Sequence, residues 1–190
     1  MVKALVVIDY TNDFVADDGR LTCGESGQSI ERRITELTQS FVEAGEYVVF
    51  AVDVHDENDP HHPESTLFPA HNIRGTSGRF QYGELGEYYE KVKDRVYWMD
   101  KTRYSAFAGT DLELKLRERG IHELHLVGVC TDICVLHTAI DAYNEGFKIV
   151  VHEDAVQTFN PAGHEWALDH FKNTLGAEVV KAAERSNVTK

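Results

Sequence analysis

Short runs of apolar residues recur along this chain, and each run ends at a polar or glycine-containing segment. Continuous apolar runs of this length are typical of strands buried on both faces of a parallel sheet. Between the runs, apolar residues recur at helical spacing and stop at glycines, which predicts helices. The predicted strands are residues 4–8, 47–52, 95–99, 124–127, 148–151 and, as a short last strand, 177–180. The predicted helices are residues 27–44, 111–119 and 161–175, and one that begins near Thr131 and ends before Gly146.

Strands that alternate with helices predict a mostly parallel sheet with helices on both faces. We therefore expect a three-layer α/β/α, Rossmann-like fold with a sheet of about six strands. The 190 residues contain no repeat and no Pro/Gly-rich linker, so a single domain over residues 1–190 is expected. Residues 55–86 form a long polar segment rich in His, Pro, Gly and Asn, and loops of this length in compact domains are usually functional.

Reactive side chains stand where the predicted strands end. Asp9, Asp53, Lys101 and Cys134 all lie at or just past the carboxyl end of a strand. Ligands bind at this edge in open α/β sheets. Four such residues at four strand ends therefore predict an active site there.

Cys134 is the candidate nucleophile. Thr131 and Asp132 are good N-cap residues, which would place Cys134 in the first turn of a helix, where the helix dipole favours the reactive thiolate. Asp9 could take the thiol proton, and the Lys101 ammonium could stabilise a thiolate or an oxyanion. Taken singly, each residue also has an ordinary reading: an inert buried cysteine, a capping carboxylate and a surface cation.

The loop after residue 53 carries candidate metal ligands. Asp53 and His55 are two apart on one strand face, and Glu64 and His71 could close the site from the loop. Carboxylate and imidazole ligands without thiolate suit Zn²⁺, Mn²⁺ or Fe²⁺. The alternative is a polar surface loop with incidental histidines. His61 and His62 lie in the same loop and remain open as ligands instead.

Four aromatic residues stand near the reactive positions in the sequence: Phe14, Phe68, Trp98 and Tyr104. Core packing is the usual role of such residues. A flat slot for an aromatic ring is the sharper hypothesis, above all for Phe14 and Tyr104, which lie just beyond strand ends.

Composition narrows the partners and the compartment. The formal net charge of −13 argues against nucleic acid or an anionic membrane as the main partner. The apolar start of the chain is far too short to span a membrane. Three cysteines, an odd number, fit free thiols in a reducing compartment, so we expect the cytoplasm. Cys23 has no evident partner, and Cys130 and Cys134 lack the C-x-x-C redox spacing.

These residues together resemble the isochorismatase-like cysteine hydrolase superfamily, and within it the nicotinamidases. The resemblance covers nearly the whole chain, and it is carried by four stretches of sequence. These are Val7-Ile-Asp9-Tyr-Thr-Asn-Asp-Phe14, Asp53-Val-His55 with its loop, Asp100-Lys101, and Val129-Cys-Thr-Asp-Ile-Cys134-Val. The aspartate, lysine and cysteine identify the superfamily, and the metal loop narrows it to nicotinamidases because many relatives lack a metal.

The resemblance implies a function: deamidation of nicotinamide, and of pyrazinamide, through an acyl-thioester in NAD salvage and pyridine nucleotide biosynthesis. It implies Cys134 as nucleophile, Asp9 as general base and acid, and Lys101 as their electrostatic partner. The backbone N–H groups of Cys130 and Cys134 would form the oxyanion hole, after a cis Val129–Cys130 peptide.

The resemblance further implies one divalent metal ion, most simply Zn²⁺, on Asp53, His55, Glu64 and His71. Phe14, Phe68 and Tyr104 would form the walls of the pyridine slot. A small-molecule substrate and a homo-oligomeric state are also implied.

The chain departs from the family pattern at Glu64, where relatives commonly have histidine, and at Cys130, where they often have alanine. The closest rival function is an amidase of the same superfamily acting on a carbamoyl or ureido substrate. A non-catalytic metal-binding or partner-binding module is a rival from another class. An isochorismate-type hydrolase fits poorly, because those relatives lack the cysteine nucleophile.

Overall fold

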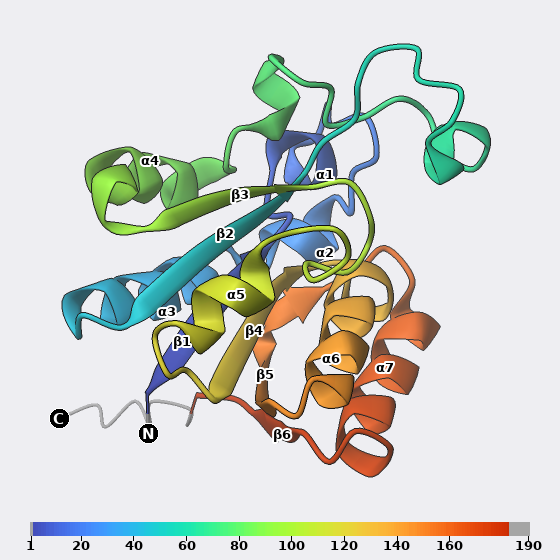
Figure 1. Cartoon of the computed structure of the whole chain (residues 1–190). Coiled ribbons are helices and arrows are strands. Elements are labelled where there is room, and N and C mark those ends of the chain that lie inside the picture. The colour runs from blue at the N-terminus through green and yellow to red at the C-terminus, as the bar shows by residue number, and fades with distance from the viewer. Residues whose placement is uncertain (1, 183–190) are drawn as a thin grey trace, which may run out of the picture.

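A six-stranded sheet forms the centre of the molecule in the computed structural model, which describes residues 2–182 (Figure 1). Its spatial order is β3-β2-β1-β4-β5-β6, and each neighbouring pair runs parallel. The strands are β1 (Lys3–Ile8), β2 (Tyr47–Asp53), β3 (Tyr97–Lys101), β4 (Glu123–Val129), β5 (Lys148–Gln157) and β6 (Glu178–Val180). The predicted α/β class, the parallel sheet and the strand count are therefore confirmed.

The apolar runs are buried because helices cover both faces of the sheet (Figure 1). Along β1, alternate residues enter different cores: Ala4, Val6 and Ile8 pack on one face, and Leu5 and Val7 on the other. The first core also receives buried side chains from α5 (Leu112–Arg117), α6 (Leu136–Asn144) and α7 (Pro161–Asn173). The second receives them from α3 (Glu31–Glu43) and α4 (Gly83–Val92).

Several element boundaries differ from the sequence prediction. The predicted helix 27–44 is two helices, α2 (Glu25–Gln28) and α3, since Ser29 hydrogen-bonds back to the Ser26 carbonyl and closes the first turn. Helix α4 was not predicted; glycines at its first and fourth positions hide its helical pattern. Strand β3 starts two residues late because a 3₁₀ turn, η3 (Lys93–Arg95), precedes it.

Strand β5 extends six residues past its apolar run. Its pairing with β4 is irregular between Leu126 and Gly128, and it resumes at Val156 and Gln157 after three polar positions. The polar interruption is what makes the sequence signal stop early.

The segment between β2 and α4 lies beyond the carboxyl edge of the sheet (Figure 1). It contains only two short 3₁₀ turns, η1 (Pro63–Thr66) and η2 (Ser77–Arg79). His55 fixes its start, since its backbone N–H donates to the Asn72 carbonyl and its own carbonyl accepts from Arg74. The long polar segment is thus folded back on itself over the strand ends.

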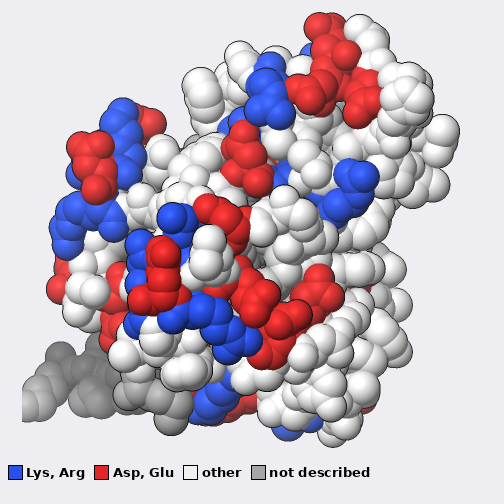
Figure 2. Space-filling model, in the orientation of Figure 1, with Lys and Arg blue, Asp and Glu red and all other residues white. Residues whose placement is uncertain are grey.

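On the face shown in Figure 2, acidic and basic side chains are interspersed. Among residues 2–182, every helix is too short or too polar to cross a lipid bilayer.

Candidate active site

Four adjacent strands deliver the predicted catalytic side chains to one edge of the sheet. Lys101 ends β3, Asp53 ends β2, and Asp9 directly follows β1. Cys134 follows β4 within a π-helical turn, η4 (Thr131–Val135). The order of these strands places the group where the chain changes direction across the sheet, at the junction of β1 and β4. Ligands bind at this junction in open α/β folds.

Asp9, Lys101 and Cys134 are in mutual contact. Lys101 Nζ lies 2.7 Å from Asp9 Oδ2 and donates to Cys134 Sγ at 3.6 Å. Asp9 and Lys101 are 0% and 1% exposed, so water screens their charges very little. The backbone N–H of Asp53 donates to Asp9 Oδ1 at 2.7 Å, which fixes the carboxylate in place.

The charges of this group are set by burial and by one another. Burial raises the pKa of Asp9 above its usual value; the Lys101 ammonium opposes this, and the Asp53 carboxylate adds to it. Burial alone would lower the pKa of Lys101, but Asp9, Cys134 and Asp53 together raise it. The ammonium therefore stays charged at neutral pH.

At Cys134, burial works against the thiolate that a helix start favours. Burial raises the pKa of this thiol well above its usual range, and Lys101 only partly offsets the effect. The predicted N-cap residues, Thr131 and Asp132, do not cap this turn: both lie inside η4, and Cys130 occupies the N-cap position. The Thr131 hydroxyl instead pairs with His164 Nδ1 at 2.9 Å. The Val129–Cys130 peptide is cis, as the resemblance implied.

The candidate metal ligands form one cluster beside this group. Asp53 Oδ2 lies 2.7 Å from His55 Nε2 and 3.4 Å from His71 Nε2, and His71 Nε2 lies 3.6 Å from Glu64 Oε2. The donor atoms of Asp53, His55 and His71 lie within 4.8 Å of one another, as do those of His55, His62 and Glu64. The sequence thus named four residues that the fold brings together.

The cluster has the chemistry of a cation site. Asp53 Oδ1 and His71 Nε2 are buried and make no hydrogen bond with any residue in 2–182. The Nδ1–H of His71 is directed to the Pro69 carbonyl at 2.8 Å, which leaves the Nε2 lone pair for a cation. Burial favours a protonated Asp53, but the Lys101 charge, the hydrogen bond with His55 and the nearby His71 imidazole hold the pKa of Asp53 well below its usual value. These donors fit a divalent metal ion.

The two other loop histidines differ. His61 is exposed and belongs to neither group of donors. His62 is buried, but its Nδ1 accepts from the backbone N–H of Glu64 at 3.2 Å and its Nε2 lies 2.8 Å from the Thr102 carbonyl. His62 thus braces the loop in this structure.

A small pocket connects the thiol to the metal donors. Cys134 and Cys130 line one part of it, and Glu64 lines another. Its walls include the three aromatic residues that the sequence analysis assigned to the slot, Phe14, Phe68 and Tyr104. Leu21, Ile133 and Phe159 also line it. The lining is mostly apolar and aromatic, which suits contact with the faces of a flat ring.

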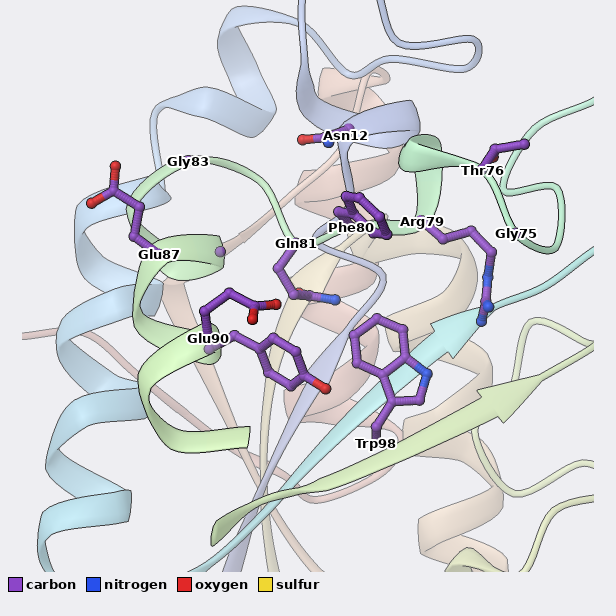
Figure 3. A pocket seen from close by; sticks show the side chains of 12 residues that line it. Asn12, Gly75, Thr76, Arg79, Phe80, Gln81, Gly83, Glu87, Glu90 and Trp98 are labelled. Carbon is purple, nitrogen blue, oxygen red and sulfur yellow. The ribbon is translucent and has the colours of Figure 1, made fainter. Parts of the chain in front are cut away.

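Trp98 does not belong to this pocket. It lies three residues before Lys101 on β3, so its side chain faces the other side of the strand. There it lines a separate cavity of about 700 Å³ with Gln81 and Phe80 (Figure 3). Its indole N–H donates to Asp100 Oδ1 at 2.9 Å.

The Isochorismatase domain family matches residues 3–184. This chain belongs to the isochorismatase family. Among solved structures it is similar to the nicotinamidase/pyrazinamidase PncA of Bacillus subtilis, with a TM-score of 0.93 and 66% identity over 95% of this chain and 100% of that one. The pyrazinamidase/nicotinamidase of Streptococcus mutans UA159 gives a TM-score of 0.92 and 54% identity over 94% and 99% of the two chains.

A more distant member of the isochorismatase family bears on the metal cluster. The pyrazinamidase of Pyrococcus horikoshii, solved in complex with zinc, gives a TM-score of 0.83 and 31% identity over 96% of this chain and 100% of that one.

Sequence reasoning missed the residues that hold the loop in this isochorismatase-family site. Asp13 Oδ2 accepts from the backbone N–H of Asn72 at 2.7 Å, and the Thr11 hydroxyl donates to Asn72 Oδ1 at 3.0 Å. Asn72 follows His71 directly and has a φ of 44°, so these bonds set the position of that histidine. Phe159 was also missed, although it lies just past the end of β5, at the same sheet edge.

Proposed function

We propose that this protein is a nicotinamidase, which hydrolyses nicotinamide to nicotinic acid and ammonia. The observation that carries the proposal is the pocket that joins the Cys134 thiol to the Glu64 carboxylate of the metal-donor cluster. A ring carboxamide has two reactive ends of matching chemistry: a carbonyl carbon for the thiol and a ring nitrogen for a metal. Similarity to structures named nicotinamidase and pyrazinamidase supports the proposal.

The pocket walls position the substrate. Phe14, Phe68 and Tyr104 hold the pyridine ring between them, so that its carboxamide lies over Cys134. A divalent ion, Zn²⁺ or alternatively Mn²⁺ or Fe²⁺, would be held by Asp53, His55, Glu64 and His71 and would supply a Lewis acid for the ring nitrogen.

The first half of the reaction transfers the acyl group to sulfur. Asp9 takes the proton of the Cys134 thiol, and the sulfur attacks the carboxamide carbon. The backbone N–H groups of Cys130 and Cys134 donate to the oxyanion, and each such donor contributes about 3–4 kcal/mol. Asp9 returns its proton to the nitrogen, the C–N bond breaks, and ammonia leaves behind an acyl-thioester.

The second half releases the acid. Asp9 accepts a proton from a water molecule while the water oxygen attacks the thioester carbon, and the C–S bond then breaks. Nicotinic acid leaves, and the proton returns from Asp9 to the Cys134 sulfur. Throughout both halves the Lys101 ammonium offsets the negative charge that moves between Asp9 and the sulfur. The buried, protonated resting thiol is therefore compatible with catalysis, because its base is already in contact.

Ammonia release from nicotinamide by the purified, Zn²⁺-supplemented protein tests the proposal, with Cys134→Ala run in parallel. Release by the parent protein alone is the expected outcome. Release from N-carbamoyl amino acids without turnover of nicotinamide would instead identify the carbamoyl-amidase rival. Retention of metal with no amidase activity, and indifference to alkylation of Cys134, would identify a non-catalytic metal-binding module.

A further inference from the structure

Two thiols that the proposed mechanism does not use lie against each other beside the pocket. Cys23 Sγ is 3.4 Å from Cys130 Sγ, and the two residues are 107 positions apart in the sequence. Both side chains are buried, with 7% and 6% of their surface exposed. This pairing could not be predicted, because Cys23 stands in a glycine-containing loop that is far from the catalytic turn in the sequence.

The contact joins two separate walls of the substrate pocket. Cys130 lines the pocket itself and is the N-cap of the turn that carries Cys134. Cys23 is anchored behind Phe14, since its backbone N–H donates to the Phe14 carbonyl at 2.8 Å. Its loop also contains Leu21, which lines the pocket. A bond between the two sulfurs would fix the distance between these walls.

We propose that Cys23 and Cys130 form a modification site, at which a small hydroperoxide converts the two thiols into an intramolecular disulfide. The Cys130 sulfur, reached through the pocket, attacks one peroxide oxygen; the O–O bond breaks, and a sulfenic acid and one water (from hydrogen peroxide) form. The Cys23 sulfur then attacks the Cys130 sulfur and displaces a second water. Two thiols are oxidised by two electrons in total, and hydrogen peroxide is reduced to two molecules of water.

The surroundings set the pace of this reaction. The hydrogen bond with Cys23, together with burial, raises the pKa of the Cys130 thiol well above its usual value. Because the thiolate is the reacting form, oxidation should be slow at neutral pH and faster at alkaline pH. The reducing interior of a cell would keep the pair as thiols until peroxide accumulates.

Peptide mapping after treatment with hydrogen peroxide tests the proposal without any activity measurement, so its failure is distinct from a failure of the proposed function. Trypsin leaves Cys23 in residues 21–32, and leaves Cys130 and Cys134 together in residues 120–148. In Cys134→Ala, we expect loss of both remaining thiols and a cross-link between the two peptides, reversed by dithiothreitol. The cross-linked protein should also unfold several degrees higher, because the bond closes a long loop.

Cys23→Ser in the same Cys134→Ala background is the matched control, and it should keep one thiol and form no intramolecular cross-link. Mapping the parent protein guards against a folding defect in the variants. A disulfide confined to residues 120–148 would mean that Cys130 pairs with Cys134, and would overturn the assignment. Sulfinic or sulfonic acid at Cys130 without a cross-link, or disulfide-linked dimers, would overturn it as well.

Discussion

Cys130 and Cys134 lie on the same turn and line the same pocket, yet the structure gives them different neighbours. Lys101 and Asp9 contact Cys134, whereas Cys130 faces Cys23. Cys134→Ala should lower amidase activity by at least about 10³-fold, because it removes the attacking atom. Cys130→Ala should retain most activity, because its proposed role is carried by the backbone. Ammonia release measures both, and elemental analysis should find metal retained in each variant. If Cys130→Ala were inactive and Cys134→Ala active, Cys130 and not Cys134 would be the nucleophile.

Gly128 is a residue whose surroundings leave no room for a side chain. It has a φ of 117°, and a Cβ atom there would lie 1.9 Å from the carbonyl oxygen of Ile8 on the neighbouring strand. Gly128→Ala should therefore destabilise the fold by about 3–5 kcal/mol through strain and overlap. Gly146→Ala is the matched control: its φ is 77° but the space around it is open, so a cost of about 1–2 kcal/mol is expected. Urea unfolding of both variants measures the difference; equal losses would contradict the steric account.

At the residue scale, chemistry at strand ends could be predicted and contacts between loops could not. Asp9, Asp53, Lys101 and Cys134 were identified because a parallel sheet brings its carboxyl ends together. The contact of Cys23 with Cys130, and that of Asp13 with Asn72, depend on how loops fold back, which apolar periodicity does not record. The raised pKa of Cys134 could not be predicted, because burial opposes the helix-start effect and burial is a property of the whole fold.

The segment between β2 and α4 contributes most of the metal donors, and His71 is its most deeply buried imidazole, at 1% exposure. His71→Ala should lose bound metal, since it removes a donor whose Nε2 has no other use. Elemental analysis after dialysis is the measurement. His61→Ala, an exposed neighbour outside the cluster, should retain the parent stoichiometry. Unchanged metal content in His71→Ala would remove this residue from the ligand set.

Strands β4 and β5 carry a histidine pair in which His152 is buried and His125 is half-buried. His125 Nδ1 lies 2.8 Å from His152 Nε2, and Glu123 accepts at 3.0 Å on the far side of His125. Burial, with His125 and Arg33 nearby, lowers the pKa of His152 to about 4; Asp154 opposes this, and Lys3 contributes to it.

This pair predicts a loss of stability in mild acid. A histidine that titrates at about 4 when folded and 6.5 when unfolded leaves stability intact above pH 6.5. As the pH falls from 6.5 to 4, the unfolded chain binds the proton first, and about 3 kcal/mol is lost. Urea unfolding of metal-free protein between pH 4.5 and 7.5 measures this. His152→Gln should flatten the profile, whereas the exposed His122→Gln should not. Parallel profiles for parent and His152→Gln would refute the account.

At the element scale, helices and strands could be predicted where the pattern of apolar residues kept one spacing over the whole element. The five apolar runs of β1 to β5 were found for that reason. Helix α4 was missed because Gly83 and Gly86 interrupt a pattern carried by Leu85 and Val92, which are buried against α3 and the sheet. The second half of β5 was missed because polar residues occupy the positions where its pairing shifts.

At the scale of the whole molecule, metal binding should contribute to global stability. The donors come from β2 and from a loop folded over several strand ends, so the unfolded chain cannot hold them together. An ion present at a hundredfold excess over its Kd would stabilise the fold by about 2.7 kcal/mol. A chelator should therefore lower the Tm of the parent by several degrees and leave the Tm of His71→Ala nearly unchanged. Differential scanning calorimetry measures this; an equal decrease in both proteins would show that chelation acts elsewhere.

The layered architecture could be predicted from the sequence because a parallel sheet must be covered on both faces. The alternation of strands and helices therefore fixed three layers. The spatial order of the strands was not predicted, since neighbours in a sheet are chosen by crossover connections that leave no local trace. That order decides which reactive residues meet, and it is why Cys134 lies beside Asp9.

The hydrogen bond from the Asp53 backbone to Asp9 Oδ1 makes the two oxygens of that carboxylate inequivalent. Oδ1 is committed to a rigid strand end, and Oδ2 faces Lys101. A proton taken from sulfur or from water would therefore always load onto the same atom and leave from it. Oδ2 alone would carry the proton, in both halves of the reaction, and the carboxylate would not have to rotate. The rate of each proton transfer would then depend on how the thiol, the amine or the water approaches Oδ2, and not on a motion of the Asp9 side chain.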